Sequence, residues 1–304
     1  MASRGRRPGR RGDILRPPGV LWGLPAALFF GVFAVLPLVL MVLLSFATWS
    51  GIGSPVFVGG DNWARLFSDP TFVRSLAITA VITVATLVTQ VPISLLLGVW
   101  AAGFQRGRAI VSAILFTPLL LSSAAVAVLW RGLLDPNYGI PGAVRFLFGG
   151  SGNVFATQGS AIAVLTLVSA WQYTPFHTLI FQGGARAVPA TLYEAATLDG
   201  AGRVQQFFSI TLPQLRNSLI TSMILAVVGS LTTFDTILIL TRGGPGSDTT
   251  NTAFYMYSVG FLSFDFGRGS AAAVILVVVA TLVSLVLVRA SGYDRMRSQQ
   301  EGIL

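Results

Sequence analysis

The chain contains no cysteine, no lysine and a single histidine, His177. The missing cysteines exclude disulfides, thiolate metal sites and cysteine nucleophiles. One histidine also excludes a histidine-based metal cluster, so we expect no metal site. The net charge of +9 therefore comes from arginines alone, and these are scattered along the sequence. Because no basic domain gathers them, nucleic-acid binding explains this charge poorly, and we expect no nucleic-acid partner.

Charged residues are scarce as well. They make up 10% of the chain, and hydrophobic residues make up 53%. A soluble domain carries about 25% charged residues. A chain of this composition cannot hide its apolar surface in one water-facing core. It is therefore predicted to be an all-α integral membrane protein that contacts lipid.

Long apolar runs predict six transmembrane helices, because a bilayer core needs about 20 apolar residues in helix. The expected spans lie near residues 21–47, 73–101, 110–133, 161–183, 218–240 and 270–289. Four of them contain a proline, where kinks are expected: Pro37, Pro92, Pro118 and Pro175. Six spans place both chain ends on the same side of the membrane.

The distribution of arginine indicates which side that is. Fourteen arginines fall in the N-terminal arm, the loop after the second span, residues 185–217 and the tail, and six fall on the other face. The positive-inside rule then places both termini and residues 185–217 in the cytoplasm (N-in/C-in). Arg10-Arg11 could also indicate a twin-arginine signal peptide, but the apolar run that follows is too long and lacks an A-x-A site.

Residues 194–213, EAATLDGAGRVQQFFSITLP, form a polar island between two apolar segments. A helix is predicted from Pro189 to about Asp199, because proline suits the first turn of a helix. Gly200 fits a C-terminal cap with positive φ. Leu192, Ala195 and Ala196 would share one face, on which two alanines let another protein approach closely.

A second helix is expected to follow, with Val204, Phe207 and Phe208 on one face and an end or kink at Pro213. The predicted product is a short helix, a tight turn and a helix that returns to the membrane. A loop with chemistry this defined at a membrane surface indicates a docking site for a soluble partner. An ordinary capped connector is the alternative interpretation.

The island resembles the EAA loop of permease subunits of bacterial ABC importers, whose pattern is E-A-A-x3-G-x9-I-x-L-P. The match holds at every defined position: Glu194, Ala195, Ala196, Gly200, Ile210, Leu212 and Pro213. The resemblance implies the ABC importer permease (MetI-like) fold. It also implies that the loop sits in a cleft of an ATP-binding subunit, where Glu194 pairs with a basic group and Gly200 provides the turn.

Two further segments carry the resemblance beyond the island. Phe234-Asp235 and the T-R-G-G-P sequence at 241–245, followed by Thr249, Thr250, Tyr255 and Tyr257, resemble a pattern found in one of the two permease types of carbohydrate importers. Residues 57–63, FVGGDNW, resemble the F-V-G-L-D-N-Y segment of the same family, with Gly60 in place of leucine. The resemblance covers roughly residues 20 to 290 and implies carbohydrate import.

The partners follow from the resemblance. It implies a heterodimer with a second, different permease, two cytoplasmic ATPase subunits, and an extracellular or lipid-anchored solute-binding protein, in the bacterial plasma membrane. ATP and Mg would bind to the ATPase subunits, because this chain has no GxxxxGK[ST] phosphate loop. No cofactor and no catalytic residue are therefore expected here.

The expected organisation has four parts. Residues 1–20 are a cytoplasmic arginine-rich arm, and residues 21–72 hold the first transmembrane helix and an outer loop. Residues 73–290 are the permease core, with the EAA loop at 185–217, and residues 291–304 are a cytoplasmic tail.

Candidate residues for a substrate path lie in the apolar segments. Asp235 would either border the path or be a structural carboxylate near the outer end of its span, because an acid inside a membrane faces protein or water. Trp130, Trp171, Tyr173 and His177 could stack on or bond to a sugar, or could anchor and pack helices instead. Gly243-Gly244-Pro245 predicts a tight outer loop that could also contact the binding protein.

Two other function classes stay open at this point. An ion-coupled secondary transporter would carry repeats and membrane-embedded coupling acids. The chain shows no repeat, and Asp235 is its only acid deep in an expected span. An integral membrane enzyme would need a metal cluster, a nucleophile motif or paired carboxylates, and the sequence offers none of these.

Overall fold

The computed structural model describes residues 20–103, 108–142 and 153–290, and this part of the chain is almost entirely helical. Residues 1–19 of the predicted N-terminal arm and the predicted tail at 291–304 lie outside the described residues. A 3₁₀ turn, η1 (Val20–Gly23), leads into α1 (Leu24–Phe30), a π-helical turn η2 (Gly31–Val35) and α2 (Leu36–Leu44). A two-stranded antiparallel hairpin follows, β1 (Ala47–Thr48) with β2 (Val56–Phe57).

The long helices of the body come next. After the short α3 (Asp61–Ser68), α4 runs from Pro70 to Ala102. Asp69 caps it by accepting a hydrogen bond from the Thr71 amide at 2.8 Å, which satisfies one of the free N–H groups at its start. A bent pair follows: α5 (Arg108–Phe116) with the 3₁₀ turn η3 (Thr117–Leu120), then α6 (Ser123–Leu133).

The second half begins with α8 (Gln158–Ala187), which a capping box of Thr157 and Ser160 starts. The EAA loop carries α9 (Ala190–Leu198), α10 (Arg203–Gln206), a π-helical turn η4 (Phe207–Thr211) and α11 (Leu212–Gln214). The described part of the chain ends with α12 (Arg216–Leu231), α13 (Asp235–Leu240), α14 (Thr252–Tyr257), η5 (Ser258–Leu262) and α15 (Phe266–Ala290).

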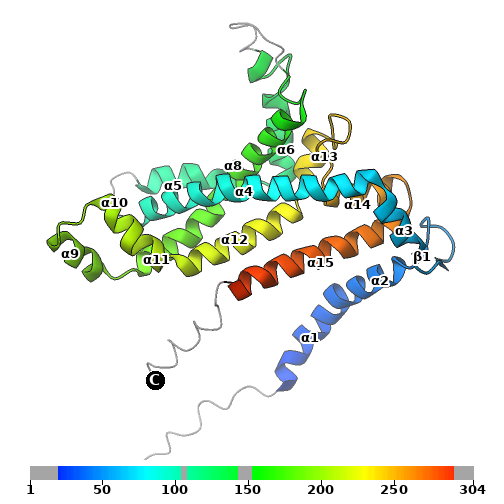
Figure 1. Cartoon of the computed structure of the whole chain (residues 1–304), viewed down its shortest axis with the longest axis horizontal. Coiled ribbons are helices and arrows are strands. Elements are labelled where there is room, and N and C mark those ends of the chain that lie inside the picture. The colour runs from blue at the N-terminus through cyan, green and yellow to red at the C-terminus, as the bar shows by residue number, and fades with distance from the viewer. Residues whose placement is uncertain (1–19, 104–107, 143–152, 291–304) are drawn as a thin grey trace, which may run out of the picture.

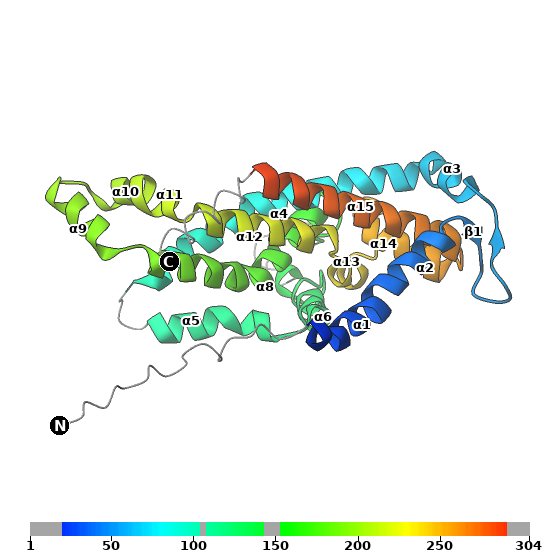
Figure 2. The same cartoon turned by 90° about the horizontal axis from the view of Figure 1, so that it is seen from below.

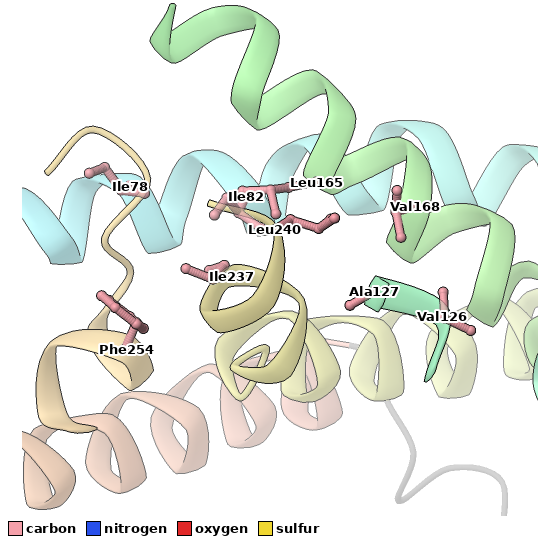
Figure 3. Close-up of a cluster of buried hydrophobic side chains, with 9 residues drawn as sticks. All are labelled: Ile78, Ile82, Val126, Ala127, Leu165, Val168, Ile237, Leu240 and Phe254. Atoms are coloured by element: carbon pink, nitrogen blue, oxygen red, sulfur yellow. The ribbon is translucent and has the colours of Figure 1, made fainter. Parts of the chain in front are cut away.

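Both views show the long helices side by side, with α9 and α10 at one end and the hairpin and α3 at the other (Figures 1 and 2). Helices α4 and α8 form the most extensive helix–helix contact among the described residues. Gly98 of α4 allows this contact, because a Cβ there would lie 2.5 Å from Cβ of Phe181. Near the other end of α4, Ile78 and Ile82 pack with residues of α6, α8, α13 and α14 around Ile237 and Phe254 (Figure 3).

Within the described residues, three helices are long and apolar enough to span a membrane: Leu24–Leu44, Pro70–Ala102 and Phe266–Arg289. Ile110–Leu120 and Ser123–Leu133 form a fourth if the pair, bent by 101°, is a single span. The predicted count of six is therefore not confirmed. α8 has 30 residues but buries polar side chains such as Gln172 and His177.

The expected span 218–240 is interrupted in the structure. Helix α12 ends at Leu231, and α13 begins only at Asp235. The bend of the third expected span follows the 3₁₀ turn that contains Pro118, in agreement with the predicted kink. Pro92 and Pro175 lie inside continuous helices. Their missing N–H groups are therefore accommodated without ending the helix.

Candidate functional site

The EAA loop forms the helix, turn and helix that its sequence predicts. Pro189 stands at the N-cap of α9, one position before the first helical residue, whereas the sequence predicted it inside the first turn. Asp199 stands at the C-cap. Gly200 has φ +79°. The Ala201 amide donates a hydrogen bond to the Ala196 carbonyl at 2.8 Å, and this closes the helix end. The predicted glycine cap is confirmed, because only glycine adopts this backbone without strain.

Side-chain hydrogen bonds hold the two halves of the loop together. The Tyr193 hydroxyl on α9 lies 2.9 Å from Oγ1 of Thr211, which is 4% exposed. Nε2 of Gln206 donates to the Thr197 hydroxyl at 3.1 Å and to the Ala201 carbonyl at 2.9 Å. The loop is therefore a braced unit. The EAA pattern defines none of these residues, so sequence reasoning missed them.

The outer surface of the loop carries several uncovered apolar side chains. Large side chains of Leu192, Leu198, Val204 and Phe208 are exposed, and so are Glu194, Ala195 and Pro213. Ala196, Ile210 and Leu212 are half-buried. An apolar patch of this kind on a polar segment is characteristic of a protein-binding surface.

One expectation about the loop fails. Val204, Phe207 and Phe208 were predicted to share one helix face. Phe207 instead packs against the buried cluster around Phe181 and Leu215, whereas Val204 and Phe208 stay exposed. The chain widens into the π-helical turn η4 at Phe207, and a π-turn changes the angle between successive side chains.

A cavity of about 460 Å³ lies between α4, η3, α6, α8, α12 and α13. It brings together three of the five predicted path residues: Tyr173, His177 and Asp235. The Tyr173 hydroxyl lies 2.7 Å from Oγ of Ser123, and Nδ1 of His177 lies 2.8 Å from Oγ of Ser222. His177 is buried and hydrogen-bonded, as expected of a satisfied polar group.

Polar side chains from several helices complete the lining of this cavity. Gln90 and Thr86 contribute from α4, Ser169 from α8, and Thr232 and Thr233 from the connection between α12 and α13. These residues were missed from the sequence. The isolated amide of Gln90 in an apolar run was the one available signal, because polar groups inside a membrane segment tend to face a cavity or a partner.

The two tryptophans among the predicted path residues lie elsewhere. Trp130 packs against the buried cluster of Figure 3 and meets Trp171 edge to face, with ring centroids 5.6 Å apart. Trp171 lines a second, mostly apolar cavity of about 570 Å³ between α4, α5, η3 and α8. Their contacts are those of helix packing.

Residues 241–250 form the predicted tight loop. Gly243 has φ +83°, and the Gly244 amide donates to the Thr241 carbonyl at 2.9 Å. The Thr249 hydroxyl donates to the Gly244 carbonyl at 2.7 Å, and the Thr250 hydroxyl donates to the Gly243 carbonyl at 3.3 Å. Pro245 is half-buried in this turn. Thr249 and Thr250 are buried, so their hydroxyls fix the loop from inside.

A polar network joins α4, α14 and α15 at the same end of the molecule. The Tyr255 hydroxyl donates to Oδ2 of Asp69 at 2.7 Å, and Arg268 lies 3.8 Å from the same oxygen. Burial alone would raise the pKa of Asp69. The hydrogen bonds from Tyr255 and Thr71 outweigh burial and lower that pKa. Burial is the main cause that raises the pKa of Tyr255, and the hydrogen bond to Asp69 is the next largest.

Comparison with known proteins agrees with this arrangement. Residues 94–293 match the family model described as "Binding-protein-dependent transport system inner membrane component". The trehalose/maltose transport system permease protein MalF of Thermococcus litoralis is 31% identical over 282 residues, which cover 91% of this chain and 94% of that protein. The sulfoquinovosyl glycerol transport system permease protein SmoG of Agrobacterium fabrum is 32% identical over 279 residues, 89% of each chain.

A solved structure shares the fold. It is a chain from the crystal structure of a bacterial alginate ABC transporter in complex with an alginate pentasaccharide-bound periplasmic protein. It superposes with a TM-score of 0.79 at 21% identity and covers 90% of this chain and 94% of that one. The family match and the relatives above 30% identity exclude the ion-coupled transporter and the enzyme. The chain belongs to the family of binding-protein-dependent transport system inner membrane components, and it is a multi-pass permease subunit of an ABC importer.

Proposed function

We propose that this chain passes a saccharide, released by an external binding protein, into the cytoplasm by alternating access. It would act with a second, different permease and with two ATPase subunits that bind ATP and Mg. The observation that carries the proposal is the EAA loop, which is braced internally by Tyr193 and Gln206 but exposes apolar side chains outward. A rigid element with an uncovered apolar surface can transmit the motion of a partner.

The saccharide assignment has support in the relatives, whose names include sugar permeases. The cavity chemistry also favours it. Tyr173, Phe176 and Phe234 can stack on the apolar faces of sugar rings, and the neighbouring hydroxyls and the Gln90 amide can bond to sugar hydroxyls. The path would therefore include Tyr173, His177 and Asp235. Trp130 and Trp171 would support its walls.

The topology belongs to the same proposal. Six spans with both ends in the cytoplasm would place the EAA loop at 185–217 beside the ATPases. The turn at Gly243-Gly244-Pro245 would then lie outside, where it can contact the binding protein. In this arrangement α12 and α13 together make the fifth span, and the break between them opens onto the cavity.

The test replaces Glu194 by lysine in the complete importer. Glu194 is exposed on α9, and we propose that it pairs with a basic group of the ATPase. Glu194→Lys should abolish uptake and weaken co-purification of the ATPase, while the chain still inserts. Gln205→Lys is the control, because it introduces the same lysine at an exposed position of the same loop outside α9. It changes the net charge by one unit, against two units for Glu194→Lys.

Uptake is measured in proteoliposomes after proton and sodium gradients are collapsed. Uptake that follows ATP supports the proposal. Wild-type uptake by Glu194→Lys would remove Glu194 from the docking surface, and equal loss in Gln205→Lys would show a general charge effect instead of a specific pair.

A further inference from the structure

Among the described residues that line it, the cavity has one carboxylate and no cationic side chain to balance it. Asp235 is exposed and lines the wall. Among the described residues, its carboxylate takes part in no ion pair or side-chain hydrogen bond. Within the part of the chain that the structure describes, no arginine lines the cavity, and the sequence has no lysine at all. His177 in the same wall is buried and bonded to Ser222.

The position of Asp235 is fixed by the helix that carries it. Ile237 is completely buried and Leu240 is 8% exposed, and both hold α13 against α6 and α4 (Figure 3). Residues two positions apart point to nearly opposite sides of a helix. The packing that buries Ile237 therefore turns Asp235 toward the cavity. A structural carboxylate, the alternative from the sequence, would have a partner here.

An unbalanced carboxylate in the wall of a confined cavity acts more strongly on other charges in that cavity than it would in open water, because less water and salt lie between the charges. We infer that Asp235 makes the path electronegative, so that it admits uncharged saccharides and excludes anionic ones. The inference rests on the proposed function of the cavity as the substrate path. It adds a property that the relatives leave open, since one similar transporter imports the acidic polysaccharide alginate.

The absence of cysteine from the chain makes the test direct. Thr232→Cys and Ser169→Cys each place a single thiol of this chain on a different wall of the cavity. Ile52→Cys, at an 87% exposed position of the hairpin, gives the reference reactivity in open water. The assembled importer in nanodiscs is treated at pH 7.5 with a cationic trimethylammonium-ethyl or an anionic sulfonatoethyl methanethiosulfonate, and modification of this chain is followed by mass spectrometry.

The measured quantity is the ratio of cationic to anionic modification rates, divided by the same ratio for Ile52→Cys. We expect a value of at least about fivefold at both cavity thiols, because a nearby unit charge attracts one reagent and repels the other. Asp235→Asn should reduce the ratio toward one, and Asp235→Glu should keep it.

A normalised ratio at or below one in the cysteine variants that keep Asp235 overturns the inference. This outcome does not depend on whether Asp235→Asn and Asp235→Glu assemble. A high ratio that survives Asp235→Asn also overturns it, because the field would then come from another group. The labelling needs neither transport nor ATP. Failure of the inference therefore appears as a ratio near one in an importer that still takes up solute, whereas failure of the docking proposal leaves the ratio unchanged.

Discussion

At the α9–α10 end of the molecule, Leu198, Val204 and Phe208 are 90%, 72% and 61% exposed. At the α14–α15 end, Thr249, Asn251 and Thr252 are polar and yet no more than 1% exposed. At these residues each end departs from the usual distribution, because apolar side chains are exposed at one end and polar ones are buried at the other; Figure 1 shows where the two ends lie. The buried polar groups have partners within the chain, such as Thr79 for Thr252 at 2.9 Å.

Both ends are held by internal hydrogen bonds, and the EAA loop also leaves large apolar side chains uncovered. At the α14 end, Thr249, Asn251 and Thr252 form hydrogen bonds with other residues of this chain, as most buried polar groups do. The EAA loop is also braced, but its apolar face has no covering within the described residues. We therefore expect changes at the α14 end to alter stability, and changes in the EAA loop to alter coupling to the ATPase.

The largest effect is expected from deletion of residues 200–203. The deletion removes the positive-φ turn at Gly200 and the carbonyl of Ala201 to which Gln206 donates. Uptake and co-purification of the ATPase should both be lost while the chain still inserts. Deletion of residues 51–54 from the hairpin removes the same number of residues at the opposite end and should leave ATPase co-purification intact. Retained ATPase binding after the first deletion would contradict the docking role.

A large loss of stability is expected at the other end from Gly267→Ala. A Cβ there would collide with the Ala47 carbonyl oxygen and Nδ2 of Asn62. Overpacking of this kind costs about 1–3 kcal/mol, so the melting temperature should fall. Gly183→Ala is the matched control, because nothing lies within 4 Å of its added Cβ. Equal melting temperatures for the two variants would show that this end relaxes around the methyl group.

An intermediate effect is expected from Tyr193→Phe, which removes the 2.9 Å partner of the buried Thr211 hydroxyl and leaves it only the longer bond of 3.5 Å to the Gln206 carbonyl. The hydrogen bond contributes about 1 kcal/mol, so uptake per ATP hydrolysed should fall by about twofold to tenfold. Adding Thr211→Val should cost less than the sum of the two single changes. Tyr138→Phe makes the same chemical change at a 95% exposed residue and serves as control. Strict additivity would mean that the two hydroxyls act independently.

The smallest effect concerns acid stability. Because the folded pKa of Asp69 is lowered, its contribution is present above the unfolded pKa of about 3.9 and is lost as the pH falls through the folded value. Tyr255→Phe removes the strongest of the hydrogen bonds that lower this pKa. The variant should already be less stable at neutral pH. Its melting temperature should then fall less than that of the wild type when the pH is lowered. If the fall of melting temperature at acid pH is the same in the variant and the wild type, Asp69 does not contribute to acid stability.

The sequence predicted the EAA loop closely, because its signals are local. The proline before α9 fixes its own φ, and the glycine after α9 permits a positive φ, regardless of what surrounds them. The tight turn at Gly243 was predictable for the same reason. The helix face on which Phe207 lies was not predictable, because the π-turn that redirects this side chain depends on packing against Phe181 and Leu215.

Composition and local pattern by themselves determined the membrane class, the family and the turn at Gly200. The tertiary structure alone decided which polar side chains meet. Gln90, Tyr173 and Asp235 lie on three helices far apart in sequence, yet they line one cavity. The brace between Tyr193 and Thr211 likewise spans two helices. The physical reason is that a helical period fixes which face a residue occupies, whereas packing fixes which face of another helix it meets.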